Sequence, residues 1–169
     1  MLCNRALADP QSEKISHIKA AFVYNIAKFV DWPAEVTASR SSHFVFCYYR
    51  EDFLGRGFDS ILGKQVQQRS VQKRVVEAIK DAPACDVMLI PESQLDRFQH
   101  ERALSRLDPA LTIADLTQPG TRESVHDKAI INLVRDGRGI GFEVNLNHAK
   151  QSGLAISSEL LKLARAITP

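Results

Sequence analysis

Apolar side chains recur every three or four residues along the first part of the chain, at Ile15, Ile18, Phe22, Ile26 and Phe29. This is the period of an amphipathic helix that buries one stripe. Asp9 and Pro10 are an N-cap residue and a proline at the first helical position, and the Trp32-Pro33 pair stops the pattern. The sequence therefore predicts a long opening helix that ends before Pro33.

Two short segments, residues 43–49 and 86–90, are apolar at successive positions rather than at alternate ones. Such runs are typical of strands covered by helices on both faces, so we expect 43–49 to be a central strand. Between them, the spacing of leucine and phenylalanine predicts a short helix over 53–62, and a mostly polar segment predicts an edge-like strand over 66–76. The first half of the chain therefore alternates helices with strands.

The second half of the chain continues this alternation. The predicted elements are a helix over 91–107, a strand over 111–114, a polar loop over 115–128, a hairpin of strands 129–134 and 140–146, and a final helix over 157–167 that packs back on the sheet. Strands that alternate with helices predict an α/β fold, and the late hairpin makes the sheet mixed. We therefore expect a three-layer α/β sandwich with a mixed, mostly parallel sheet and a C-terminal antiparallel hairpin.

Side chains of opposite character alternate along the last strand of that hairpin. We expect Phe142 and Val144 to face the core, and Glu143 and Asn145 to share a polar face that is available for contact. A solvated sheet face or a cross-strand ion pair would produce the same pattern. Both interpretations of this strand therefore stay open.

Composition and charge exclude several classes of partner. The 169 residues are 44% hydrophobic and 25% charged, which is enough to bury a core, and we expect a single domain over 9–169. The formal net charge is only +2, and lysine and arginine are spread along the chain, so the sequence argues against a nucleic-acid partner. No apolar run is long enough to cross a bilayer, so we expect contact with the inner membrane to be peripheral at most.

Motifs for catalysis and for cofactor or metal binding are weak. Gly137, Gly139 and Gly141 precede a strand, whereas a dinucleotide-binding loop must open a helix. The five histidines are scattered, none at the spacing of a zinc site, and no serine lies in a nucleophile elbow. We therefore predict a protein that is not an enzyme and that has no cofactor and no metal.

The first residues and the cysteines bear on the cellular compartment. Ala6-Leu7-Ala8 has the small-x-small pattern that signal peptidase cleaves after, which would make 1–8 the remnant of a signal peptide, although the tripeptide is also a common one. Its removal would take Cys3 with it and leave Cys47 and Cys85. These two are either small buried thiols or a disulfide, which requires neighbouring strands in a workable register.

Six segments together resemble the YfiR-like family of periplasmic regulators, and the resemblance spans nearly the whole chain. The segments are 18–33 (IKAAFVYNIAKFVDWP), 85–90 (CDVMLI), 111–115 (LTIAD), 129–134 (AIINLV), 141–146 (GFEVNL) and 152–164 (SGLAISSELLKLA). The resemblance implies an exported α/β domain in the periplasm, frequent homodimers, and a Cys47–Cys85 disulfide in that oxidising compartment. A second cysteine pair, which some members carry within 115–134, has no counterpart here.

The resemblance also implies a function. In the best-known setting of the family, the domain binds the periplasmic sensor region of a membrane-bound diguanylate cyclase and holds it inactive, which lowers cyclic-di-GMP and restrains biofilm formation. We expect partner contact along 142–158, through Phe142, Glu143, Asn145, His148 and Ser157. The alternative is a small-molecule sensor that uses the crevice at the carboxyl ends of the strands and acts with a sensor kinase or an outer-membrane receptor.

Overall fold

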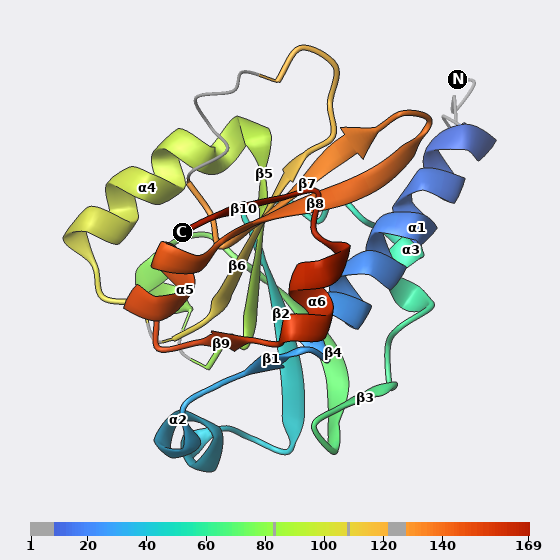
Figure 1. Cartoon of the computed structure of the whole chain (residues 1–169). Coiled ribbons are helices and arrows are strands. Elements are labelled where there is room, and N and C mark those ends of the chain that lie inside the picture. The colour runs from blue at the N-terminus through green and yellow to red at the C-terminus, as the bar shows by residue number, and fades with distance from the viewer. Residues whose placement is uncertain (1–8, 83, 108, 122–127) are drawn as a thin grey trace.

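The computed structural model describes residues 9–82, 84–107, 109–121 and 128–169 (Figure 1). An eight-stranded sheet forms the centre of this part of the chain. Its strands, in spatial order, are β10 (Ala166–Thr168), β8 (Gly139–Asn145), β7 (Ile131–Asp136), β6 (Leu111–Leu116), β5 (Val87–Pro91), β2 (His43–Tyr49), β4 (Arg69–Val76) and β3 (Gln65–Val66). The predicted signal-peptide remnant, residues 1–8, lies outside the described residues.

The directions of the strands agree with the predicted mixed, mostly parallel sheet. The neighbouring strands β7, β6, β5, β2 and β4 are all parallel. β8 runs antiparallel to β7 and forms the predicted hairpin, with Phe142 opposite Leu133. At the two edges, β3 is antiparallel to β4 and β10 is parallel to β8.

Helices cover both faces of the sheet and complete the predicted three layers (Figure 1). The helices and remaining short strands are α1 (Pro10–Ala27), β1 (Val30–Asp31), α2 (Ala34–Ser39), α3 (Arg56–Asp59), η1 (Ile79–Asp81), η2 (Glu92–Gln94), α4 (Leu95–Leu104), α5 (Leu146–Gln151), β9 (Ala155–Ile156) and α6 (Ser158–Leu163). Residues of α1, α3 and α6 pack in the core on one face, and residues of η1 and α4 pack in the core on the other.

The opening helix begins as predicted but ends earlier. The Asp9 carboxylate caps α1 by accepting a hydrogen bond from the backbone N–H of Gln11 at 3.3 Å. α1 ends at Ala27, before Trp32, because the chain then extends into β1 and pairs antiparallel with β9. β1 and β9 form a small sheet of their own, which joins the end of α1 to the segment before α6.

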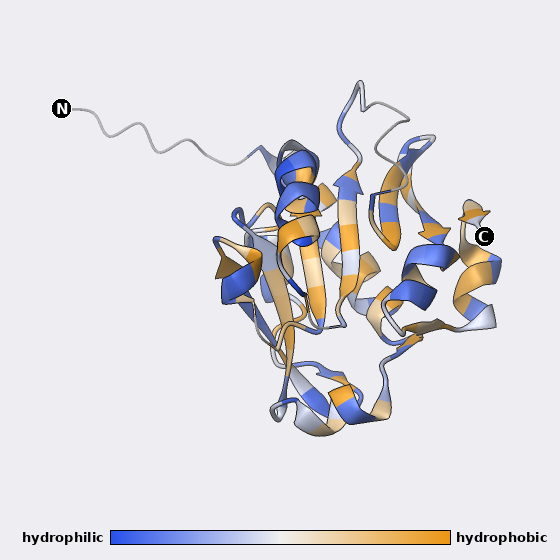
Figure 2. Ribbon diagram, turned by 90° about the vertical axis from the view of Figure 1, so that its left-hand side faces the viewer, coloured by the Kyte–Doolittle hydropathy of each residue, from blue (hydrophilic) through white to orange (hydrophobic). Residues whose placement is uncertain are grey.

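β2 is buried on both faces, as predicted for a central strand. Phe46 and Tyr48 pack edge-on against Phe58 of α3, and Tyr49 packs edge-on against Phe98 of α4. Such aromatic pairs contribute about 0.5–1.5 kcal/mol each beyond the burial of their area. Figure 2 shows apolar residues along the strands and mixed apolar and polar residues along the helices that cover them.

Two elements predicted between the first two buried strands differ in the structure. The helix predicted over 53–62 is reduced to the single turn of α3, because Gly55 immediately before it has a φ of 45° and a non-helical backbone. The strand predicted over 66–76 is split into β3 and β4 by Gln67 and Gln68, whose φ values of 50° and 63° make a tight hairpin turn. β3, and not β4, is therefore the edge strand.

Two predicted boundaries after β5 also shift. The helix predicted over 91–107 begins as the 3-10 turn η2 and continues as α4 only to Leu104. The strand predicted over 111–114 continues to Leu116, because Asp115 and Leu116 pair with β7. The predicted loop therefore starts at Thr117, and residues 122–127 of it lie outside the described part of the chain.

The predicted final helix is wrong beyond Leu163. α6 ends there, and the backbone N–H of Arg165 donates to the carbonyl oxygen of Phe142 at 2.8 Å. β10 then pairs in parallel with β8, with Ala166 beside Glu143. The edge of β8 offers backbone N–H and C=O groups, and the last residues of the chain pair with these groups as β10.

Candidate functional site

A groove of about 350 Å³ runs between α1 and α6, with β8 beneath it. The described residues that line it are apolar apart from one asparagine: Ile18, Ala21, Phe22, Asn25, Ile26, Phe29, Phe142, Leu160 and Leu163. Apolar and aromatic linings of this kind are typical of sites that bind an apolar ligand or a partner segment.

Backbone contacts between distant parts of the sequence hold the two walls of the groove together. The N–H of Ser157 donates to the carbonyl oxygen of Phe29 at 3.0 Å, and β1 pairs with β9 next to this bond. The Ser157 hydroxyl also caps α6 by accepting a hydrogen bond from the N–H of Leu160 at 3.2 Å. The walls of the groove therefore come from 18–33 and 152–164, the two longest segments that resemble the family.

Two large apolar side chains are exposed where these walls meet solvent. Leu163, on α6, exposes 72% of its surface, and Ile18, on α1, exposes 39%. Burying one such side chain fully contributes about 1.5–3 kcal/mol, and contiguous exposed apolar surface marks interaction sites. Ile18 and Leu163 therefore extend the apolar surface of the groove into solvent.

A larger cavity, of about 560 Å³, lies at the carboxyl ends of β2, β5 and β6. It is lined by Glu51, Phe53, Pro91, Glu92, Ser93, Leu95, Asp96, Asp115 and Gln118. Asp115 is buried, and its carboxylate accepts a hydrogen bond from the Lys19 ammonium at 2.6 Å and two from Thr117 at 3.1 and 2.7 Å. This buried ion pair ties α1 to the end of β6.

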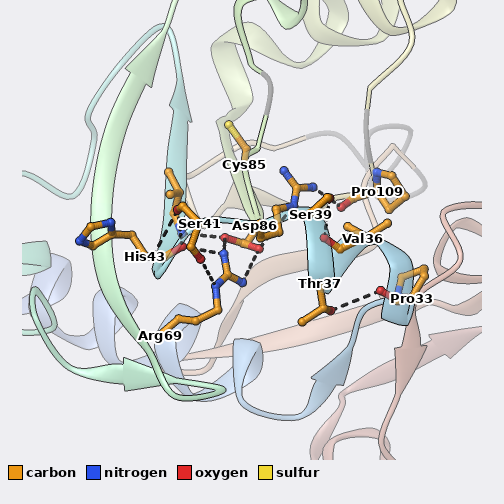
Figure 3. A network of polar contacts seen from close by, with 12 residues as sticks. Pro33, Val36, Thr37, Ser39, Ser41, His43, Arg69, Cys85, Asp86 and Pro109 are labelled. Carbon is orange, nitrogen blue, oxygen red and sulfur yellow. Dashed lines mark hydrogen bonds and ion pairs between the residues drawn. The ribbon is translucent and has the colours of Figure 1, made fainter.

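The opposite end of the parallel strands holds a buried ion-pair network centred on Asp86 (Figure 3). The Asp86 carboxylate accepts two hydrogen bonds from the Arg69 guanidinium, at 2.9 and 2.8 Å, and one from the N–H of Val45 at 2.8 Å. Arg40 lies 3.8 Å from the same carboxylate and donates to the carbonyl oxygen of Pro109 at 3.2 Å. Because these contacts join β2, β4 and β5 at their amino ends, we assign the network a structural role.

A disulfide links Cys47 of β2 to Cys85, which precedes β5, with an S–S distance of 1.94 Å. The pairing implied by the sequence resemblance is thus confirmed. Both cysteines are buried in the core beneath α4. The bond closes a loop of 38 residues, which corresponds to about 4 kcal/mol in the chain-entropy model.

The five residues predicted to contact a partner do not lie on one surface. Phe142 lines the groove, and Ser157 caps the helix that forms one of its walls. Glu143 lies half-buried on the opposite face of β8, and Asn145 is buried because its side chain caps α5 by accepting a hydrogen bond from the N–H of His148 at 2.9 Å. The polar face predicted to be available is therefore partly closed by α5.

The helical spacing of apolar residues from Ile15 to Phe29 predicts a single buried stripe, which places the α1 wall of the groove in the core. Val23 and Ala27 of α1 are indeed buried, whereas Ile18, Phe22 and Phe29 stand beside them at the groove. An apolar surface on α1 that is wider than one stripe is the sequence feature that indicates this groove. A second apolar stripe needs a second surface to cover it. The periodicity alone does not show whether that surface belongs to the same chain.

Within the described residues, no three His, Cys, Asp or Glu side chains form a group that could hold a metal ion. None of the helices in the described ranges combines the length and the hydropathy that a bilayer crossing requires.

The described part of the chain is thus a disulfide-linked α/β sandwich with an apolar surface groove. The YfiR/HmsC-like family model matches residues 16–165, and the chain belongs to this family. The family consists of periplasmic regulatory domains of cyclic-di-GMP signalling that act with membrane sensor proteins. A comparison with curated proteins finds no match to the chain.

Proposed function

We propose that this chain represses a membrane-bound diguanylate cyclase by binding the periplasmic sensor region of that enzyme. Family membership supports regulation of cyclic-di-GMP signalling from the periplasm. Repression of the cyclase would lower cyclic-di-GMP and restrain biofilm formation, and the chain itself would act by binding, without catalysis.

The groove between α1 and α6 is the docking surface in this proposal, and the exposure of Leu163 is the observation that carries it. Leu163 and Ile18 present apolar surface on opposite walls, so a segment lying between them would contact both. The occupant that fits is an apolar segment of the sensor region that presents large side chains, because the lining offers almost no hydrogen-bonding groups.

Leu163 has a matched control elsewhere on the molecule. Leu104 is the last residue of α4 just as Leu163 is the last residue of α6, and their exposed fractions are 74% and 72%. Lysine at either position is compatible with a helix C-terminus, and exposed substitutions usually change stability by less than about 0.5 kcal/mol. The two variants therefore differ mainly in the face that they alter.

The test measures cyclic-di-GMP in cells that express the membrane cyclase of the source organism with the parent chain, Leu163→Lys or Leu104→Lys. We expect the parent and Leu104→Lys to lower cyclic-di-GMP. We expect Leu163→Lys to leave cyclic-di-GMP high, since it places a charge at the proposed contact and so weakens binding to the sensor region by at least about tenfold. A parent chain that leaves cyclic-di-GMP unchanged would contradict the function, and a Leu163→Lys variant that represses fully would contradict the groove.

A second copy of the chain is the other candidate occupant of the groove, since homodimers are expected for this family. Light scattering on the purified chain distinguishes the two. A dimer that Leu163→Lys converts to monomer, while Leu104→Lys leaves it intact, would assign the groove to self-association. If the purified chain is a monomer, the sensor region remains the proposed occupant of the groove.

A small-molecule sensor that acts with a sensor kinase or an outer-membrane receptor is the second candidate function. The cavity of about 560 Å³ at the strand ends favours it, because this volume falls in the range of roughly 300–1,000 Å³ that small-molecule sites occupy. Co-purification of the chain with a sensor kinase or receptor from a membrane extract, in place of a cyclase, would support this candidate.

A further inference from the structure

The connections that leave β2 and β5 lie on opposite faces of the sheet. β2 is followed by α3, whose Phe58 packs in the core beneath α1, whereas β5 is followed by α4, whose Phe98 packs in the other core. β2 and β5 are nevertheless neighbours in the sheet. The segments that follow β2 and β5 must therefore diverge. Such a place in an open α/β sheet is called a topological switch point, and ligands bind in the crevice there.

The cavity of about 560 Å³ lies at this switch point. Glu51 and Phe53 follow β2, Pro91 and Glu92 end and follow β5, and Asp115 lies near the end of β6. The topology and the hollow surface are independent observations that indicate the same place. Neither depends on the charges of the side chains there.

The lining of the cavity is acidic. Of the four carboxylates among its described lining residues, Asp115 pairs with Lys19 at 2.6 Å and Asp96 pairs with Lys128 at 2.5 Å. Glu92 accepts a hydrogen bond from the hydroxyl of Thr121 at 2.6 Å, and no ion pair joins Glu92 or Glu51 to another described residue. The described lining therefore carries more negative charge than its neighbouring lysines compensate, and it favours a positively charged occupant.

The remaining lining residues decide what kind of cation fits. Phe53, Pro91 and Leu95 give the cavity an apolar wall, which a hydrated metal ion would not use. An aromatic ring such as that of Phe53 also attracts organic cations through its π face. Within the described part of the chain, no group of three metal-ligating side chains is present. An organic ammonium or guanidinium group with an apolar body satisfies both the carboxylates and this wall.

We propose that the cavity between the carboxyl ends of β2 and β5 binds a small organic cation that carries an apolar group. The carboxylates of Glu51 and Glu92 would hold the cationic end, and Phe53 would pack against the apolar body. This inference does not depend on repression of a cyclase, since it concerns the purified chain alone. A cation bound there would make the chain a sensor as well as a binding partner.

Isothermal titration calorimetry of the purified chain tests the proposal with phenethylamine and agmatine, which are cations at pH 7, and with 2-phenylethanol, which matches phenethylamine in shape but is neutral. We expect at least one cation to bind, with 2-phenylethanol at least about tenfold weaker. The double variant Glu51→Gln, Glu92→Gln should weaken cation binding by at least about tenfold, because it removes both uncompensated charges. Added salt should weaken it as well.

Glu35→Gln is the matched control, because Glu35 is exposed on α2, outside the lining of the cavity. We expect this variant to bind the cation as the parent does, and circular dichroism confirms that each variant is folded. The proposal is wrong if neither cation binds with a Kd below about 10 mM. It is equally wrong if 2-phenylethanol binds as well as phenethylamine, or if the double variant retains the affinity of the parent.

Discussion

The backbone N–H of Ser157 donates a hydrogen bond to the carbonyl oxygen of Phe29 at 3.0 Å, and this bond joins the end of the first helix to the start of the last. Main-chain contacts thus fix the position of the two walls of the groove between α1 and α6 relative to each other. Surfaces built on such rigid elements lose little conformational entropy when a partner binds.

Ser157→Ala should loosen one wall of this groove without removing any residue that lines it. The serine hydroxyl caps α6, and loss of an N-cap costs about 1 kcal/mol. Urea denaturation should report this loss, while Ser158→Ala, one residue inside the helix, should leave stability within about 0.5 kcal/mol of the parent. Equal stability of the two variants would show that the cap contributes nothing.

Removal of the disulfide by the double variant Cys47→Ala, Cys85→Ala should lower the free energy of unfolding by about 4 kcal/mol, because the loop between the cysteines is then free in the unfolded state. Denaturation of the parent with and without reductant should show a comparable difference, and the double variant should not respond to reductant. Full alkylation of both cysteines in the native parent, before any reductant is added, would contradict the bond.

Asp86→Asn should be far more destabilising than loss of an exposed ion pair. Removing the carboxylate leaves the buried Arg69 and Arg40 side chains uncompensated, at a cost of about 3–5 kcal/mol. Asp136→Asn breaks the ion pair between Asp136 and Arg165, in which both side chains are about half-exposed. This variant should lower the free energy of unfolding by less than about 1 kcal/mol. Thermal unfolding of both variants measures the contrast, and similar melting temperatures would argue against the structural role of the network.

The sequence predicts the fold class because the buried strands are marked by composition. Residues 43–49 are apolar at successive positions, and this segment coincides with β2. The predicted final helix fails because helical spacing in 157–167 describes only six residues of that stretch correctly, Ser158–Leu163. Whether the next residues continue the helix depends on the open edge of β8, and no pattern local to the segment contains that information.

The candidate site is less predictable than the fold for a similar reason. Phe142 can be placed on a core-facing strand from its alternation, but the groove exists only because α1 and α6 leave a space above it. Glu143 and Asn145 alternate with Phe142, yet Asn145 is drawn inward as the cap of α5. Local periodicity predicts which face a side chain takes, whereas exposure depends on what the rest of the chain places over that face.

The two faces of β8 give competing positions for the partner. The sequence pattern predicts that the partner contacts the face of β8 that carries Glu143. The groove lies on the other face, where Phe142 and Leu163 lie. Glu143→Lys and Leu163→Lys both make the chain more positively charged, so their long-range electrostatic effects on binding have the same sign. They differ in the surface that each alters directly.

Affinity for the isolated sensor region should therefore separate the two positions. If the groove is the docking surface, Leu163→Lys weakens binding by at least about tenfold, whereas Glu143→Lys retains the affinity of the parent within about twofold. Circular dichroism and urea denaturation check that Glu143→Lys remains folded, since this side chain is half-buried. The reverse result, a folded Glu143→Lys that no longer binds beside a Leu163→Lys that does, would move the interface to the face that carries Glu143.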